Sequence, residues 1–176
     1  MSIKHLFLIV ATLSIALGCQ PPQSDEKYSK IEKQNTIKPM VSQKKLTLNE
    51  AKKLAETQFK KYLPTILDAH DAYVDSQDTF TGDFTGDGLA DIAIYFSLAP
   101  KEGGNAIVGQ GLTLYKNMGT TVKVLAGYEP DYYFNVVKIA DGKIHVQKLA
   151  YAETDGRCCP SIKTEHTLTI AGGKAY

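Results

Sequence analysis

The chain has 176 residues, enough for one domain with a hydrophobic core but too few for two ordinary domains beside an export signal and a linker. Its 20 Lys and Arg nearly balance its 19 Asp and Glu, so no strong electrostatic field favours nucleic acid as a partner. The absence of Trp weighs against a carbohydrate-stacking platform, although Tyr and Phe are plentiful.

An export signal is predicted at the N-terminus, where Lys4 gives a short basic start and an apolar run extends from Leu6 to Leu17. As a helix this run would span roughly 18 Å, well short of the ~30 Å hydrocarbon core of a membrane. We therefore predict a signal peptide over residues 1–18 and not a membrane-spanning helix. Removal of the signal leaves basic and acidic side chains equal in number.

Cys19 follows the apolar run and is predicted to be a lipid attachment site. The segment Ala16-Leu17-Gly18-Cys19 resembles the bacterial lipobox, which implies a diacylglyceryl group on Cys19 and an acylated N-terminus after cleavage. Leu17 departs from the usual lipobox, and Ala16-x-Gly18 also suits ordinary signal peptidase, so secretion with an unmodified Cys19 stays open. Gln20 resembles the sorting signal of outer-membrane lipoproteins. We expect an outer-membrane lipoprotein facing the periplasm or the cell surface, with a soluble periplasmic protein as the alternative.

Residues 19–45 are predicted to form a flexible tether that begins at the lipidated cysteine. Pro, Gln, Ser and charged residues dominate this segment, so it cannot bury enough surface to offset the entropy of ordering. Random-coil scaling gives it a reach of roughly 25 to 30 Å. We expect it to hold one globular domain, residues 46–176, away from the membrane surface.

An amphipathic helix is predicted to begin at the capping box Thr47-Leu48-Asn49-Glu50 and to end at Pro64. Beyond it the hydrophobic period falls towards two and turn signals recur, which indicates strands. Asp141-Gly142 predicts a two-residue type I′ hairpin turn, because both positions tolerate positive φ. The fold class predicted is α+β, with this one helix packed on an antiparallel sheet of about six strands. The six predicted strands are residues 90–98, 107–115, 121–128, 132–139, 143–151 and 164–170.

The most specific motif is an acidic glycine-rich loop that leads into an apolar strand. Turns tightened by Gly86 and Gly88 can curl alternate residues inwards, and hard cations such as calcium take six to eight oxygen ligands. Carboxylates about 4 Å apart would otherwise repel by roughly 4 kcal/mol at an effective dielectric of 20, so a neutralising partner is expected if they converge. The candidate calcium ligands, at loop positions 1, 3, 5, 7 and 9, are Asp83, Thr85, Asp87, the Leu89 carbonyl and Asp91.

This loop resembles the calcium loops of FG-GAP and integrin-α-type repeats, in which D-x-[DN]-x-D-G-x-x-D precedes a strand. The resemblance implies a calcium site, weakened by Thr85 where a stronger oxygen donor is usual. It does not imply a propeller, because the motif occurs once. An EF-hand is excluded, since Ile94 stands where a bidentate Glu is needed. An ordinary Asp/Gly turn with solvated carboxylates stays open.

The other cysteines, Cys158 and Cys159, are neighbours. In an oxidising compartment they are expected to pair as a vicinal disulfide, which constrains a turn and not the fold. A redox switch, a strained turn that presents a binding loop, and a local staple or two thiols without activity all stay open. The acidic loop followed by this CCP segment resembles a group of small bacterial lipoproteins and secreted proteins, and the resemblance implies no particular activity.

No catalytic residue is predicted, because the patterns of a nucleophile elbow, a zinc-protease helix and a phosphate-binding glycine loop do not occur. We expect a membrane-tethered, non-enzymatic envelope lipoprotein that binds or inhibits a partner, such as another envelope protein. Two alternatives stay open. One is a metal-assisted hydrolase that uses Asp83, Asp87 and Asp91, and the other is a redox module at Cys158 and Cys159.

Overall fold

The structure is a computed structural model that describes residues 44–104, 106–156 and 158–176. The predicted signal peptide, Cys19 and nearly all of the predicted tether therefore lie outside the described residues. The described residues belong to one compact unit with one helix and nine strands. That one helix is not long and apolar enough to cross a membrane.

The helix α1 (Leu48–His70) begins at the predicted capping box. The Thr47 hydroxyl accepts a hydrogen bond from the Glu50 N–H at 3.3 Å, and the Glu50 carboxylate accepts one from the Thr47 N–H at 2.9 Å, so this prediction is confirmed. The prediction that the helix ends at Pro64 is wrong. Ile66 beyond the proline is buried against the sheet, and this packing offsets the backbone hydrogen bond that proline removes.

Sheet A contains six strands in the order β1-β2-β3-β4-β9-β8. The first four form an antiparallel meander, and β9 lies parallel to β4 through the pairing of Gly127 with Lys174. Sheet A comprises β1 (Ala72–Gly82), β2 (Asp91–Pro100), β3 (Gly109–Asn117), β4 (Val122–Tyr128), β8 (Ile170–Ala171) and β9 (Lys174–Ala175).

Sheet B contains three antiparallel strands, β5 (Tyr133–Ala140), β6 (Lys143–Ala150) and β7 (Ile162–Thr167). Asp141 and Gly142 join β5 to β6 with φ angles of 54° and 71°, as the predicted type I′ turn requires. Each of the six predicted strands has a counterpart among β2 to β7. The polar edge strand β1 was not predicted, because its sequence AYVDSQDTFTG lacks an apolar run.

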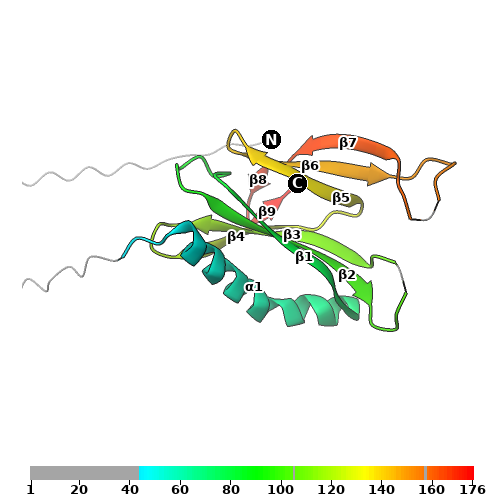
Figure 1. The fold of residues 1–176 in the computed structure, drawn as a ribbon, viewed down its shortest axis with the longest axis horizontal. Coiled ribbons are helices and arrows are strands. Elements are labelled where there is room, and N and C mark those ends of the chain that lie inside the picture. Colours follow the sequence, from blue (N-terminus) through cyan, green and yellow to red (C-terminus); the bar gives the residue numbers. More distant parts are fainter. Residues whose placement is uncertain (1–43, 105, 157) are drawn as a thin grey trace, which may run out of the picture. The chain divides into compact units, whose positions relative to one another are not determined.

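The predicted α+β class, a helix on a single sheet of about six strands, is wrong. The fold is β-rich, with 48% of the described residues in the strands of two sheets. The helix covers one face of sheet A and sheet B packs on the other, which gives three layers (Figure 1). The strand β2 is almost continuously buried because it is covered on both faces. An apolar run of this kind shows that both faces are covered, but not that a second sheet covers one of them.

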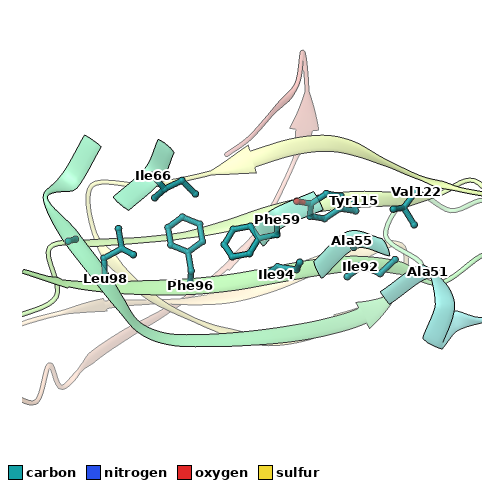
Figure 2. Packing of buried hydrophobic residues seen from close by; sticks show 11 residues of the cluster. Ala51, Ala55, Phe59, Ile66, Ile92, Ile94, Phe96, Leu98, Tyr115 and Val122 are labelled. Carbon is teal, nitrogen blue, oxygen red and sulfur yellow. The ribbon is translucent and has the colours of Figure 1, made fainter. Parts of the chain in front are cut away.

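Two hydrophobic cores hold the layers together. On the helix side the Phe59 ring lies beside Phe96, with centroids 5.7 Å apart, and Ala55 lies near Ile92 (Figure 2). Between the sheets the fully buried Phe134 of β5 makes edge contacts with Tyr95 and Tyr128. Successive residues of β2 point to opposite faces, so this one strand contributes to both cores.

Candidate functional site

The acidic loop connects β1 to β2, and Asp83 closes its turn. One Asp83 oxygen, Oδ1, accepts hydrogen bonds from the N–H groups of Gly86 and Asp87 at 2.6 and 3.2 Å. The other, Oδ2, accepts one from the Gly88 N–H at 2.8 Å. Gly86 and Gly88 adopt φ angles of 75° and 83°, which glycine reaches without a steric penalty. Asp83 therefore binds backbone N–H groups of its own loop.

Asp91 is fully buried and ties the acidic loop to β3. Its Oδ2 accepts hydrogen bonds from the N–H groups of Phe84 and Thr85 at 3.2 and 3.0 Å, and its Oδ1 accepts one from the Asn117 N–H at 2.9 Å. Burial raises the pKa of Asp91, although these N–H donors favour the ionised carboxylate and oppose the shift. Asp91 is thus a structural carboxylate in the interior.

Asp87 has a charged partner that the sequence did not suggest. Its Oδ2 lies 2.9 Å from the Nζ of Lys116 on β3. This contact holds the pKa of Asp87 below its usual value and raises the pKa of Lys116. The negative charges of Asp91 and Asp83 also raise the pKa of Lys116. The neutralising partner expected for the loop is therefore a lysine of this chain. Lys116 directly follows the predicted strand 107–115, and nothing in the sequence links it to the acidic loop.

The predicted calcium ligands share one loop but do not converge on one point. Among the described residues there is no group of three His, Cys, Asp or Glu side chains that could hold a metal. Thr85 donates its backbone N–H to Asp91, and Leu89 donates its backbone N–H to Asp87. The acidic side chains are therefore not grouped around one cation position in this arrangement. A carboxylate oxygen that accepts an N–H keeps a further lone pair that can bind a cation, so calcium binding stays a prediction.

A second feature is a cleft between the two sheets, which the sequence analysis did not anticipate. We call it the inter-sheet cleft; its larger cavity has a volume of about 790 Å³, and an adjoining cavity of about 360 Å³ shares four of its lining residues. Small-molecule sites typically occupy 300 to 1,000 Å³. The larger cavity is lined by Tyr95, Ala106, Ile107, Gln110, Tyr133, Asn135, Leu149, Tyr151, Cys158 and Pro160.

Gln110 lines the inter-sheet cleft and joins the two sheets through hydrogen bonds. This buried side chain accepts a hydrogen bond from the Phe134 N–H at 3.0 Å and donates one to the Phe134 carbonyl at 2.7 Å, so it joins β3 to β5 as a neighbouring strand would. Its amide nitrogen also donates to the Tyr95 hydroxyl at 2.5 Å. The Tyr133 hydroxyl donates to the Ile107 carbonyl at 3.3 Å. The cleft is therefore preformed by hydrogen bonds between the sheets.

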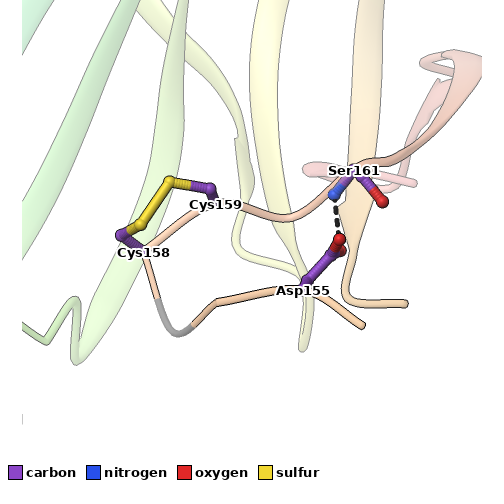
Figure 3. The surroundings of a disulfide bond; sticks show 4 residues. All are labelled: Asp155, Cys158, Cys159 and Ser161. Atoms are coloured by element: carbon purple, nitrogen blue, oxygen red, sulfur yellow. Dashed lines mark hydrogen bonds between the residues drawn. A yellow bond between two sulfur atoms is a disulfide. The ribbon is translucent and has the colours of Figure 1, made fainter. Parts of the chain in front are cut away.

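The disulfide joins Cys158, which lines the larger cavity of the inter-sheet cleft, to Cys159. Its loop is held by Asp155, which accepts hydrogen bonds from the N–H groups of Ala152 and Ser161 at 2.7 and 2.8 Å. These bonds lower the pKa of Asp155. Figure 3 shows the disulfide on the side of the loop that faces the green strands of sheet A, with Asp155 bonded to Ser161.

Comparison with protein-family models, with curated proteins and with solved structures finds no match to this chain. The resemblances to FG-GAP loops and to small bacterial lipoproteins therefore stay predictions from the sequence.

Proposed function

We propose that this chain is an exported, lipid-anchored envelope protein that binds a ligand in the inter-sheet cleft and carries out no reaction of its own. The observation that carries the proposal is the cleft itself, a preformed cavity of about 790 Å³ between two packed sheets. Preformed concave sites with a few polar groups are the usual places for small ligands. A ligand bound there would contact both sheets at once.

The lining of the larger cavity supports binding in preference to catalysis. Tyrosine, aliphatic, proline, amide and disulfide groups line it, and no His, Lys, Arg, Asp or Glu stands among its described lining residues. A nucleophile needs a base within hydrogen-bond reach, and no described lining residue brings a carboxylate, an imidazole or an amine beside the tyrosine hydroxyls to serve as one. The metal-assisted hydrolase is not proposed further, because the acidic loop offers no grouped metal ligands.

The anchor rests on the sequence of the first 45 residues. An apolar run ends at Cys19, and a polar segment rich in Pro, Gln and Ser separates that cysteine from α1. A lipid there would retain the protein at the membrane, because each buried methylene contributes about 0.8 kcal/mol. The polar segment would present the domain and its cleft to solutes of the envelope.

Intact mass of the full-length protein, expressed in a bacterium that processes lipoproteins, tests the anchor. We expect the mature chain to begin at Cys19, to carry acyl groups and to sediment with membranes. The matched control is Cys19→Ser, which we expect to be unacylated and released from the membrane fraction. If the wild-type and control proteins carry no acyl groups and fractionate alike, the anchor is refuted and plain secretion takes its place.

Ligand binding in the cleft is tested by perturbing its wall. Tyr133→Ala removes a lining ring and should abolish the binding of small molecules found by a ligand-observed NMR screen of the full chain. Tyr62→Ala is the control, because Tyr62 is an exposed tyrosine on the helix side of sheet A and does not line this cleft. Small molecules that bind equally well to both variants would place the ligand elsewhere and overturn the proposal.

A further inference from the structure

Two loops that are far apart in the sequence both line the larger cavity of the inter-sheet cleft. Ala106 and Ile107 come from the connection between β2 and β3, and Cys158 and Pro160 come from the connection between β6 and β7. The disulfide makes Cys158 and Cys159 one ring-shaped group in place of two separate thiols. Through Cys158 this group adds a polarisable, uncharged surface to the lining.

The lining determines the charge of a suitable ligand. The larger cavity has no charged side chain among its described lining residues. An ionised ligand would lose its hydration there without gaining a counter-ion, which is strongly unfavourable. The described residues of the larger cavity therefore favour an uncharged ligand.

The aromatic side chains determine its shape. Tyr95, Tyr133 and Tyr151 all line the larger cavity, together with Leu149 and Pro160. Tyrosine rings pack against flat rings in offset or edge-on geometry, and sulfur makes favourable contacts with aromatic rings. These surfaces favour a flat, unsaturated ring.

The hydrogen bonds of the lining determine which polar group the ligand should carry. The Tyr95 oxygen accepts from the Gln110 amide, so the Tyr95 O–H is left to donate to an acceptor on a ligand. The Gln110 amide is itself occupied by Phe134 and Tyr95. The Asn135 side chain supplies a further donor and acceptor in the same lining. The ring should therefore carry an acceptor such as a carbonyl oxygen.

We propose that the inter-sheet cleft takes an uncharged aromatic ring bearing a carbonyl group, and that the Cys158–Cys159 disulfide is one wall of this site. The inference rests on the proposed binding function and names the class of ligand. The disulfide contacts the ring and keeps Cys158 at the lining, and it takes part in no reaction. Its removal lowers the affinity without removing the tyrosine wall.

The test uses three probes on the mature chain from residue 19 with Cys19→Ser, which retains the whole polar segment and the domain. Acetophenone is an uncharged aromatic ring with a carbonyl, benzoate is the same ring with a negative charge, and methyl glucoside is an uncharged saturated ring. Backbone NMR signals report which residues each probe affects. We expect acetophenone to bind with millimolar affinity and to shift the signals of Tyr95, Tyr133 and Cys158, and the other two probes to bind more weakly.

The disulfide is then removed by two independent routes. The double variant Cys158→Ser/Cys159→Ser lacks the sulfur atoms. Dithiothreitol instead transfers two electrons and two protons to the wild-type bond, which gives two thiols and a cyclic oxidised dithiothreitol. The double variant should weaken acetophenone binding between about twofold and tenfold, the range expected for a lost sulfur–aromatic contact. Reduction keeps both sulfur atoms but opens the ring, and it should weaken binding because Cys158 is no longer held at the lining. Tyr62→Ala should leave the affinity unchanged.

The possible failures can be told apart. In one outcome, the double variant and the reduced protein both bind acetophenone as tightly as the untreated wild type, while Tyr133→Ala loses binding. That result overturns the proposal that the disulfide is a wall of the site and leaves the binding function in place. Preferential binding of benzoate or methyl glucoside in the cleft overturns the ligand class alone. If no probe affects the cleft signals, the ligand class and the proposed cleft function both fall. The NMR spectrum of the double variant, compared with that of the reduced wild type, shows whether the domain remains folded.

Discussion

Replacing Asp91 with alanine should destabilise the domain strongly, because this carboxylate joins the acidic loop to β3 from a fully buried position. The substitution leaves the N–H groups of Phe84, Thr85 and Asn117 without their acceptor. An unsatisfied buried donor costs about 1 to 3 kcal/mol. The summed cost of the three unsatisfied N–H groups is partly offset, because the substitution also removes a buried charge. Water can also reach the N–H of the half-buried Thr85. We expect a loss of about 3 to 5 kcal/mol in the free energy of unfolding.

Urea unfolding followed by circular dichroism measures this loss. With an m-value of about 1.5 kcal/mol/M, the midpoint should fall by about 2 to 3 M. Asp87→Ala is the control, because Asp87 is an exposed aspartate of the same loop whose partner Lys116 can return to solvent. A midpoint for Asp91→Ala that falls no further than that of Asp87→Ala would refute the structural role of Asp91.

The pH dependence of the stability difference between wild type and Asp91→Ala is a second test. Burial raises the pKa of Asp91 above its ordinary value of 3.8, so its ionised form carries a desolvation cost in the folded protein. Its contribution to stability is then complete below about pH 3.8 and falls as the pH rises through the folded-state pKa. The advantage of wild type over Asp91→Ala should therefore be larger in acid than at neutral pH. An advantage that grows with pH would show that the N–H donors outweigh desolvation.

Three further predictions use other parts of the chain. Gly111→Ala should cost about 1 to 3 kcal/mol in thermal unfolding, because its methyl group would lie 2.8 Å from a ring carbon and 2.9 Å from a backbone oxygen. Gly127→Ala meets nothing within 4 Å and should be tolerated, and equal losses would contradict the packing argument. The pKa of Asp155 is lowered by backbone N–H donors, so the contribution of its loop to stability is complete above about pH 3.8 and is lost as the pH falls through the folded-state pKa. Below the folded-state pKa, the Ala152 and Ser161 amides that donate to Asp155 should lose protection against hydrogen exchange. Protection that does not change with pH would count against the role of Asp155. Millimolar calcium is expected to raise the Tm of the full-length protein and to have no effect on Asp87→Ala, and an unchanged wild-type Tm removes the calcium prediction.

Calcium and Lys116 would compete for the same carboxylate. The ammonium group of Lys116 already lies 2.9 Å from the Asp87 oxygen that an ion would need. A lysine held by the chain is present at a fixed high local concentration, whereas calcium must be supplied from solution. This competition is the physical reason to expect only weak calcium binding, and it adds to the weak ligand at Thr85 that the sequence suggests.

The sequence by itself determined the features that depend on neighbouring residues. Thr47 and Glu50 form their capping box because the two side chains reach each other across one helical turn. Asp141 and Gly142 form their turn because both accept positive φ. The apolar runs predicted the six strands β2 to β7 for the same local reason, since alternation and turn residues are read within one segment.

Only the tertiary structure decided what covers each buried face and which partner each charge finds. An apolar period shows that a face is buried, but it cannot say whether a helix or a second sheet lies on it, so the layering of sheet B was missed. Lys116 reaches Asp87, and Asn117 reaches Asp91, because β3 lies beside β2 in the folded sheet. The inter-sheet cleft has the same origin, since residues distant in sequence form it only after both sheets have packed.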